Sequence, residues 1–318
     1  MDAVLEGLRS VLEHDLINPD PATMPLLAHY TSLDAFEQIM KNDQLWFSHP
    51  SFMNDHAEVV SGIKEAQALI FEHGALPTAF STSDDYISFL DGFEQGILDY
   101  GFLHIADTYI FSFSVHAKND FNGRLSMWRG YGVDGHGVAM VIDPSKLTST
   151  QFSPLIFDKV HYLEEEERIA WLDDLFDRTA AFLKQNPLQP NQYHDAGRLL
   201  FVRVKLASIF SKHVGFKEED EWRVVYMPDR DVKGLLEDQL SYFNGPRGLE
   251  PKLKLKLQPQ PGVTDDPSLE TLIDRIILGP SRASPILKMT AQRLLAECEK
   301  KGLANTVHVS TIPFRSVK

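Results

Sequence analysis

A run of four acidic residues, 218–221, stands directly before the apolar stretch WRVVY and is the clearest candidate for chemistry in the sequence. Within it, Glu219 and Glu221 are separated by a single residue. Crowded carboxylates raise one another's pKa, and a carboxylate held near a glycosidic carbon can stabilise an oxocarbenium-like centre or activate a nucleophile. The alternative is a solvated loop in which Glu221 pairs with Arg223 or Lys217, because exposed acidic runs are common.

Small polar residues gather where the first predicted strand, LLAHYTS, becomes a helix. His29, Tyr30, Thr31 and Ser32 occupy this junction. Backbone N–H groups and hydroxyls converge at such a place and suit an anionic or nucleotide ligand. A Thr-Ser pair there is also expected to cap the following helix, and capping requires no ligand. The sequence leaves both interpretations open.

The segment MWRGYG brings aromatic rings and a guanidinium next to glycines. Glycine lets the backbone approach a flat ligand closely, and Trp128, Arg129 and Tyr131 can stack on a base or on nicotinamide. The alternative is a core tryptophan followed by a tight turn. Ligand sites concentrate on such loops, which is the only argument that favours binding here.

Several residues near position 54 belong to metal-ligating types. His49, Asn54, Asp55, His56 and Glu58 supply imidazole, amide and carboxylate groups. Their spacing matches no known ligand pattern, and Asn54 and Asp55 are already explained as helix caps. We therefore predict no metal site.

Composition limits the class of protein. Of the 318 residues, 43% are hydrophobic, which is enough for a substantial core. The chain has 31 basic and 45 acidic residues, and the resulting net charge of −14 opposes the capture of a nucleic acid. Cys298 is the only cysteine, so intramolecular disulfides are excluded and the reducing cytosol is the expected compartment. The N-terminus has no signal-peptide pattern, and no apolar run approaches the roughly 20 residues that span a bilayer. We expect a cytoplasmic protein that does not enter a membrane.

Hydrophobic periodicity predicts the elements that must position these residues. Apolar residues recur at helical spacing over 1–18 and 163–213. In TYIFSFSV, apolar and polar residues alternate with the period of two that is typical of strands, and we predict a central strand there. In residues 252–257 lysines alternate with leucines, which predicts a strand whose lysines protect a sheet edge. DRIILGP and TVHVSTIPFR, with a helix between them, predict a crossover pair. We therefore expect one α+β domain over 1–318, with a mixed, mainly antiparallel sheet flanked by helices, an N-terminal helix 1–18 and a helical insertion 163–213.

An ordered series of segments resembles a known family. HYTS, LWFSHPSFMND, FSFS, MWRGYGVDGHGVAMVID, EDEWRVVY, IILGP and STIPFR occur in the order found in the bacterial family catalogued as domain of unknown function 2971. The resemblance runs from about Tyr30 to Arg315, which is nearly the whole chain. The name of that family implies no reaction.

A remoter resemblance is to the ADP-ribosyltransferase fold. His29 with Thr31 is similar to that fold's first element, which binds the ribose and amide of NAD, and Glu219 with Glu221 is similar to its E-x-E motif. In that motif the second glutamate holds the ribose and the first assists the acceptor. Tyr131 is similar to the aromatic residue that stacks on nicotinamide. The sequence departs from the fold in its middle motif, which is not S-T-S, and in the insertion 163–213.

These resemblances imply an NAD-using, ADP-ribosyltransferase-like protein that cleaves the nicotinamide–ribose bond, with a role in bacterial defence or stress response. They imply Glu221 and Glu219 as catalytic residues. His29, Tyr30, Thr31, Trp128, Arg129 and Tyr131 would bind the dinucleotide, and Asn54, Asp55 and Arg223 the substrate.

Two other functions are kept open. One is a non-catalytic module that binds a nucleotide or a protein partner. The other is a nucleic-acid-processing enzyme, which the acidic balance disfavours. No common nucleotide-hydrolase, dinucleotide, serine-hydrolase or metalloprotease motif occurs in the chain.

Overall fold

The computed structural model describes residues 3–16, 19–53, 56–100, 108–133, 135–147, 153–231, 233–245, 248–265, 268–281 and 284–314. The chain divides into two compact units. The helical unit is formed by residues 1–17, 50–107 and 160–216, and the sheet unit by residues 18–49, 108–159 and 217–318. The single domain over 1–318 expected from the sequence stays a prediction. The predicted insertion 163–213 lies in the helical unit, but two further segments contribute to that unit.

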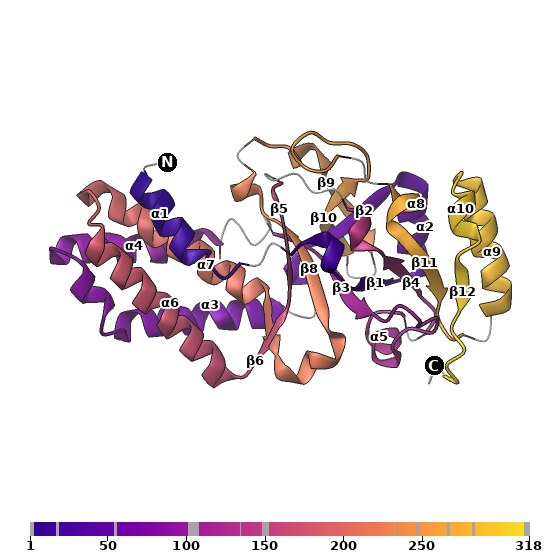
Figure 1. The fold of residues 1–318 in the computed structure, drawn as a ribbon, viewed down its shortest axis with the longest axis horizontal. Coiled ribbons are helices and arrows are strands. Elements are labelled where there is room, and N and C mark those ends of the chain that lie inside the picture. Colours follow the sequence, from indigo (N-terminus) through magenta and orange to yellow (C-terminus); the bar gives the residue numbers. More distant parts are fainter. Residues whose placement is uncertain are drawn as a thin grey trace. The chain divides into compact units, whose positions relative to one another are not determined.

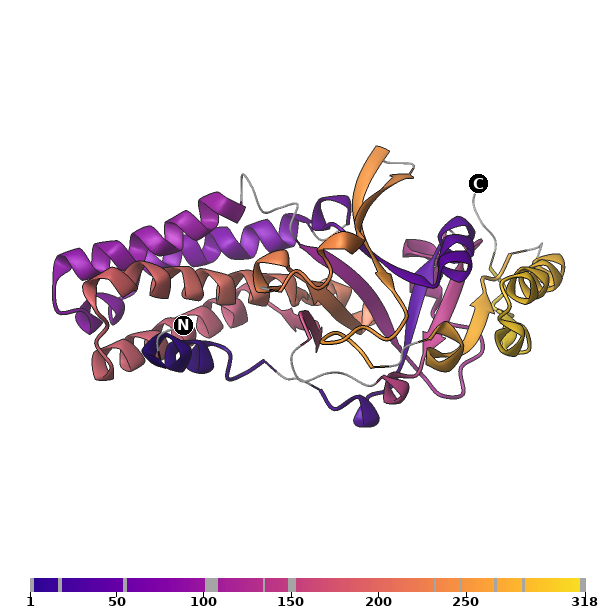
Figure 2. The ribbon, with the colours of Figure 1, turned by 90° about the horizontal axis from the view of Figure 1, so that it is seen from above.

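The helical unit is a group of helices that run roughly side by side (Figures 1 and 2). Its helices are α1 (Ala3–Leu12), α3 (His56–Glu72), α4 (Ser83–Asp99), α6 (Glu165–Gln185) and α7 (Tyr193–Ile209). The short strands β6 (His161–Leu163) and β7 (Ser211–His213) pair in parallel beside them. Helix α7 packs against α1, α3 and α4 and is therefore the centre of this unit.

Two glycines allow the close approach of α4 and α7. A Cβ added to Gly92 on α4 would collide with the backbone oxygen of His194, and one added to Gly197 on α7 would collide with the backbone oxygen of Phe89. The contact is reciprocal, so each helix uses a glycine where the other helix's backbone lies against it.

Helix α1 is fixed by a buried arginine of α7. The Arg203 guanidinium donates to the Leu12 carbonyl and to the Asp15 carboxylate, both at 2.8 Å, and lies over the Trp171 ring at 4.6 Å. Arg203 also holds the pKa of Asp15 below its ordinary value, although burial of that carboxyl acts in the opposite direction. The N-terminal helix, predicted over 1–18, ends at Leu12, whose carbonyl is the one that accepts from Arg203.

In the part of the chain that the structure describes, ten strands form the sheet of the second unit. Eight of them follow the order β12 (Val307–Val309), β11 (Ile273–Leu278), β4 (Val138–Ile142), β1 (Leu26–Thr31), β3 (Tyr109–His116), β2 (Gln44–Ser48), β10 (Gly248–Lys256) and β9 (Leu240–Gly245). The other two are β8 (Glu221–Tyr226), which pairs with β3, and β5 (Leu155–Lys159), which pairs with β8. Every pairing in this sheet is antiparallel except that of β11 with β12, so the prediction of a mixed, mainly antiparallel α+β fold is confirmed.

Helices cover the sheet. They are α2 (Leu33–Asn42), α5 (Leu125–Gly130), α8 (Leu269–Leu272), α9 (Ser284–Glu297) and α10 (Lys301–Ala304). Figure 1 shows α9 and α10 beside β12, and α9 connects β11 to the parallel strand β12, as the crossover prediction required. Short 3₁₀ helices occur at Pro21–Thr23, Pro50–Phe52, Leu76–Ala79, Pro144–Lys146, Pro190–Gln192, Val214–Glu219, Pro228–Arg230 and Glu237–Gln239.

Strand β3 is shared by three neighbours. One of its edges pairs with β8 from Tyr109 to Ser114. Along the other edge, the register with β1 ends at Ala28 opposite Ser114, and β2 meets β3 at Ser48 opposite Ile110. The sheet therefore forks between β1 and β2, with the middle of β3 at the base of the fork.

The two faces of the sheet differ in chemistry. The phenylalanine face carries Phe47, Phe111 and Phe113, which belong to the main hydrophobic core. The charged face carries Ser114, Glu221 and Arg223, since register pairs across β3 and β8 share a face.

The prediction that the lysines of residues 252–257 protect a sheet edge is wrong for Lys252. Strand β10 pairs with both β2 and β9. Lys252 is buried and donates to Glu250 at 3.0 Å and to Ser48 at 2.8 Å. The leucine side of this strand lies in the core, and on the lysine side Lys252 is paired with Glu250.

Gly92→Ala is expected to destabilise the protein by roughly 1–3 kcal/mol or more, because the methyl group has no space against α7. Chemical denaturation measures the change. Gly130→Ala is the matched control, since Gly130 is also helical and its Cβ would meet no atom within 4 Å. Equal stabilities of the two variants would contradict the close contact of α4 with α7.

Candidate functional site

His29 occupies the fork of the sheet. Its Nδ1 donates to the backbone carbonyl of Ser112 at 2.9 Å, and its ring stacks on Phe111 with centroids 4.0 Å apart. Strand β1 has left β3 at this point, so the imidazole replaces a strand partner for the Ser112 carbonyl. This side chain closes the base of the fork.

Burial lowers the pKa of His29 from its ordinary value of 6.5 to about 4, with a smaller lowering by the charge of Lys252 and an opposing effect of the Ser112 bond. The ring is therefore neutral at pH 7. Because a carbonyl can only accept, Nδ1 carries the proton and Nε2 carries the lone pair. His29 can thus accept a hydrogen bond from a ligand hydroxyl, but it cannot act as a cation there.

The predicted acidic segment is held against β3 by two hydrogen bonds. The Ser114 hydroxyl donates to the Glu219 carbonyl at 2.6 Å, and the Val115 amide donates to the Asp220 carbonyl at 2.9 Å. Asp220 has φ of +45°, a left-handed conformation that is uncommon outside glycine. This turn separates the partly exposed Glu219 from the buried Glu221.

Tyr131 and Glu219 come together. The Tyr131 hydroxyl donates to the Glu219 carboxylate at 3.0 Å. Arg124 approaches the same segment and donates to the Glu218 carbonyl at 2.7 Å and to the Asp220 carboxylate at 3.1 Å. A phenol, a guanidinium and two carboxylates therefore gather at the start of β8, from segments 88 to 96 positions apart in the sequence.

Glu221 forms a buried ion pair with Arg223. The guanidinium Nε and an Nη donate to the two carboxylate oxygens at 2.8 and 2.9 Å. Arg223 has no exposed surface and Glu221 has 7%. The sequence offered the pairing with Arg223 as an alternative, but within a solvated loop, whereas the pair is buried on the charged face.

Glu221 and His29 lie near each other in the sheet but on opposite faces. Ala28 is opposite Ser114, which is opposite Glu221, so these three share the charged face and span about 10 Å. His29 is the next residue along β1 and stacks on the phenylalanine face. The structure thus brings Tyr131 to Glu219, two residues before Glu221, and it sets His29 apart.

Two of the residues predicted to bind the dinucleotide are packed in the core. Trp128 is fully buried, donates from its indole to the Asn122 carbonyl at 2.8 Å and contacts the Tyr30 ring at 4.9 Å. The Tyr30 hydroxyl accepts from the Arg124 amide at 2.9 Å. These contacts match the core-tryptophan alternative. Tyr30 and Trp128 support the loop that carries Tyr131.

The remaining predicted residues are dispersed. Arg129 lies over the Phe314 ring at 5.6 Å, and Thr31 is the last residue of β1. Ser32 caps α2 by accepting from the Ala35 amide at 3.1 Å, in agreement with the capping interpretation. Asn54 and Asp55 lie outside the described residues.

Sequence reasoning missed Lys252 and its partners as neighbours of the fork. The charge of Lys252 lowers the pKa of His29. Lys252 also donates a hydrogen bond to the hydroxyl of Ser48, and Ser48 is the residue of β2 that pairs with β3. The alternation of lysines was the available signal, but only the pairing of β10 with β2 gives it meaning.

Among the residues that the structure describes, no group of three metal-ligating side chains is arranged to hold an ion. Within the same residues, no helix is long and apolar enough to cross a membrane.

Comparison with known proteins gives one partial match. The family described as "Protein of unknown function (DUF2971)" matches residues 127–224, about a third of the chain. This stretch contains Tyr131, Glu219 and Glu221 but not His29. The match supports the resemblance to that family over this part and not over nearly the whole chain. No curated protein and no solved structure matches the chain.

Acidification is expected to destabilise the protein partly through His29. The folded pKa of about 4 lies below the ordinary 6.5, so this contribution is complete above pH 6.5 and is lost as the pH falls to about 4. In His29→Asn, which keeps a donor for Ser112, the loss of unfolding free energy between pH 7 and 4 should be smaller by on the order of 3 kcal/mol. Urea unfolding at several pH values measures it. His136→Asn, at an exposed histidine, is the control, and parallel pH profiles of His29→Asn and wild type would refute the assignment.

Glu221→Ala is expected to lower the unfolding free energy by roughly 3–5 kcal/mol, because it leaves the Arg223 charge buried without this carboxylate. Glu218→Ala, at an exposed neighbour, should change it by about 0.5 kcal/mol or less. The double variant Glu221→Leu with Arg223→Met should recover much of the loss. Similar stabilities of Glu221→Ala and Glu218→Ala would show that the pair is not buried as described.

Proposed function

We propose that this chain is an NAD-using, ADP-ribosyltransferase-like protein that cleaves the bond between nicotinamide and ribose. The observation that supports the proposal most is the 3.0 Å hydrogen bond from Tyr131 to Glu219. It joins the aromatic residue and the first glutamate of the E-x-E pair, which the resemblance had assigned to one site. The sequence positions of these residues alone do not imply contact.

In the proposed reaction the C1′–N1 bond of NAD breaks, and its electron pair leaves with neutral nicotinamide. The ribose carbon develops positive charge, which a nearby carboxylate stabilises. A nucleophile, water or an acceptor side chain, then bonds to C1′ and loses its proton to a base. Glu219, which is partly exposed, is the carboxylate assigned to contact the ligand and acceptor.

Glu221 is assigned the electrostatic role in this proposal. Its two hydrogen bonds with Arg223 fix the plane of the carboxylate at the start of β8. Arg124, which donates to Glu218 and Asp220, is suited to a phosphate of the dinucleotide, because a guanidinium matches phosphate geometry. His29 faces the other side of the sheet and is left out of this group.

A second candidate function is a non-catalytic module that binds a nucleotide or a protein partner. The observation that favours it is the Glu221–Arg223 pair, because a carboxylate whose charge is already compensated stabilises an oxocarbenium-like centre less well. The position of His29 on the opposite face favours it also. This module would bind its ligand without turnover, and binding would survive the loss of Glu221.

Glu219→Gln is expected to reduce nicotinamide release from NAD by roughly 100-fold, since it removes the carboxylate assigned to take the proton from the nucleophile. Tyr131→Phe should reduce it by up to about tenfold, because it removes one hydrogen bond. Free nicotinamide is quantified after incubation with NAD, and rates are divided by the folded fraction of each variant.

Glu218→Gln and Tyr242→Phe are the matched controls, because both side chains are exposed and lie outside the proposed group. They should keep the wild-type rate. If wild type releases no nicotinamide but NAD raises its melting temperature, the proposal of an enzyme fails and that of a non-catalytic binding module is supported. If there is neither release nor stabilisation, both NAD proposals fail.

A further inference from the structure

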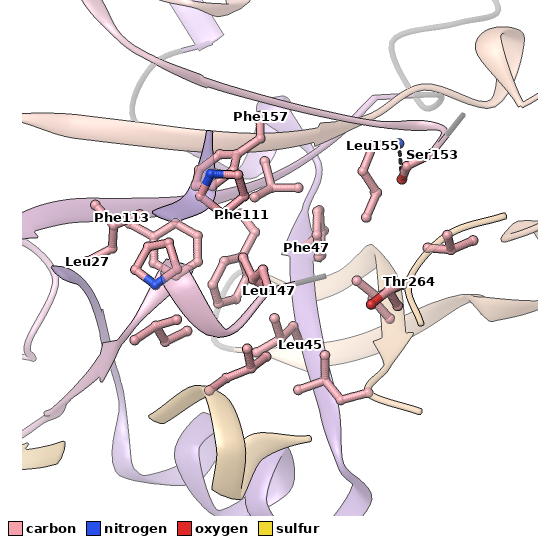
Figure 3. Close-up of a pocket in the computed structure, with 18 of the residues that line it drawn as sticks. Leu27, Leu45, Phe47, Phe111, Phe113, Leu147, Ser153, Leu155, Phe157 and Thr264 are labelled. Atoms are coloured by element: carbon pink, nitrogen blue, oxygen red, sulfur yellow. Dashed lines mark hydrogen bonds between the residues drawn. The ribbon is translucent and has the colours of Figure 1, made fainter. Parts of the chain in front are cut away.

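The sheet unit contains a cavity of about 380 Å³ on the phenylalanine face. Four phenylalanines line it, Phe47, Phe111, Phe113 and Phe157, from β2, β3 and β5. Figure 3 shows Phe111, Phe113 and Phe157 grouped on one side of the space, with Phe47, Leu45 and Leu147 around it. The group described at the start of β8 lies on the charged face, so the cavity is separate from it.

The lining is almost entirely hydrocarbon. None of the lining residues is charged, and the side chains that carry a polar atom are Ser153 and Thr264. The Ser153 hydroxyl already accepts from the Leu155 amide at 3.2 Å. Charged ligand groups would lose their hydration here without a partner, which costs several kcal/mol in general. The lining therefore selects a neutral ligand with at most one or two polar atoms.

The aromatic rings form a connected series. The Phe47 and Phe111 centroids are 5.4 Å apart, Phe111 and Phe113 4.9 Å, and Phe113 and Phe157 6.4 Å, all with tilted or edge-on planes. Such a wall offers both ring faces and ring edges to another aromatic ring, an arrangement that aromatic pairs prefer.

The volume also indicates the size of the ligand. An apolar cavity of about 150 Å³ accommodates benzene, and ligand pockets in proteins begin near 300 Å³. A space of about 380 Å³ therefore suits two or three rings.

We propose that this cavity binds a neutral aromatic small molecule of two or three rings, with its single polar group directed to Ser153 or Thr264. The site is independent of the proposed reaction on the charged face. Its occupant is recognised by ring stacking and by the exclusion of charge.

The test uses N-phenyl-1-naphthylamine, a neutral fluorophore that brightens in apolar surroundings. The full-length protein should bind it at one site. The substitutions Leu147→Trp and Thr264→Trp each fill the cavity and should weaken binding at least tenfold. Leu249→Trp, on a side chain that is 65% exposed, is the matched control and should bind as wild type does. Circular dichroism establishes that each variant is folded. Two filling variants are used so that the test still stands when one of them does not fold.

Competition decides the chemical class. Neutral 1-naphthol should displace the probe, whereas 1-naphthalenesulfonate, the same ring system with a charge, should not at equal concentration. Displacement by decanol at lower concentration than by 1-naphthol would overturn the aromatic class. Failure of wild type to bind the probe, or unchanged binding in both filling variants, would overturn the site.

Discussion

The shared edge of β3 is the constraint on which the sheet unit depends. A strand has two edges, and β3 pairs with β8 along one of them from Tyr109 to Ser114 and divides the other between β1 and β2. The division leaves the Ser112 carbonyl without a strand partner, and the His29 imidazole supplies the hydrogen bond instead. A buried carbonyl without a donor would be costly, so the fork requires a side chain of this reach and chemistry. The same demand keeps His29 neutral, because a charged ring at this position would lose its hydration.

The two faces of the sheet around the fork carry different kinds of side chain. Residues that alternate along β3, β8 and β10 send phenylalanine and leucine side chains to one face and send Ser114, Arg223 and Lys252 to the other. On the charged face each buried charge that we describe has an opposite charge beside it, Arg223 with Glu221 and Lys252 with Glu250. Paired charges of this kind fix geometry more than they add stability. The contact of Tyr131 with Glu219, two residues before Glu221, is why this face is the candidate for chemistry.

The helical unit solves a different problem, which is close packing of long helices. Gly92 and Gly197 bring α4 and α7 into backbone contact, and Arg203 attaches α1 through both a carbonyl and a carboxylate. A local pattern of apolar residues predicts helix over 1–18 and 163–213. It does not indicate that three segments far apart in the chain share one core, which is why the sequence suggested a single insertion at 163–213.

The sequence by itself determined the strand character of β3, the crossover from β11 to β12, the cap at Ser32 and the residues able to do chemistry. These depend on periodicity and on contacts a few residues apart. Tertiary structure alone decided that Tyr131 meets Glu219, that Trp128 is core and that His29 and Glu221 face opposite ways. The physical reason is that a register shift of one residue turns every side chain of a strand to the other face, and register is set by hydrogen bonds between segments distant in the chain. The cavity of the phenylalanine face depends on the same pairings, because its lining residues come from strands that are not consecutive.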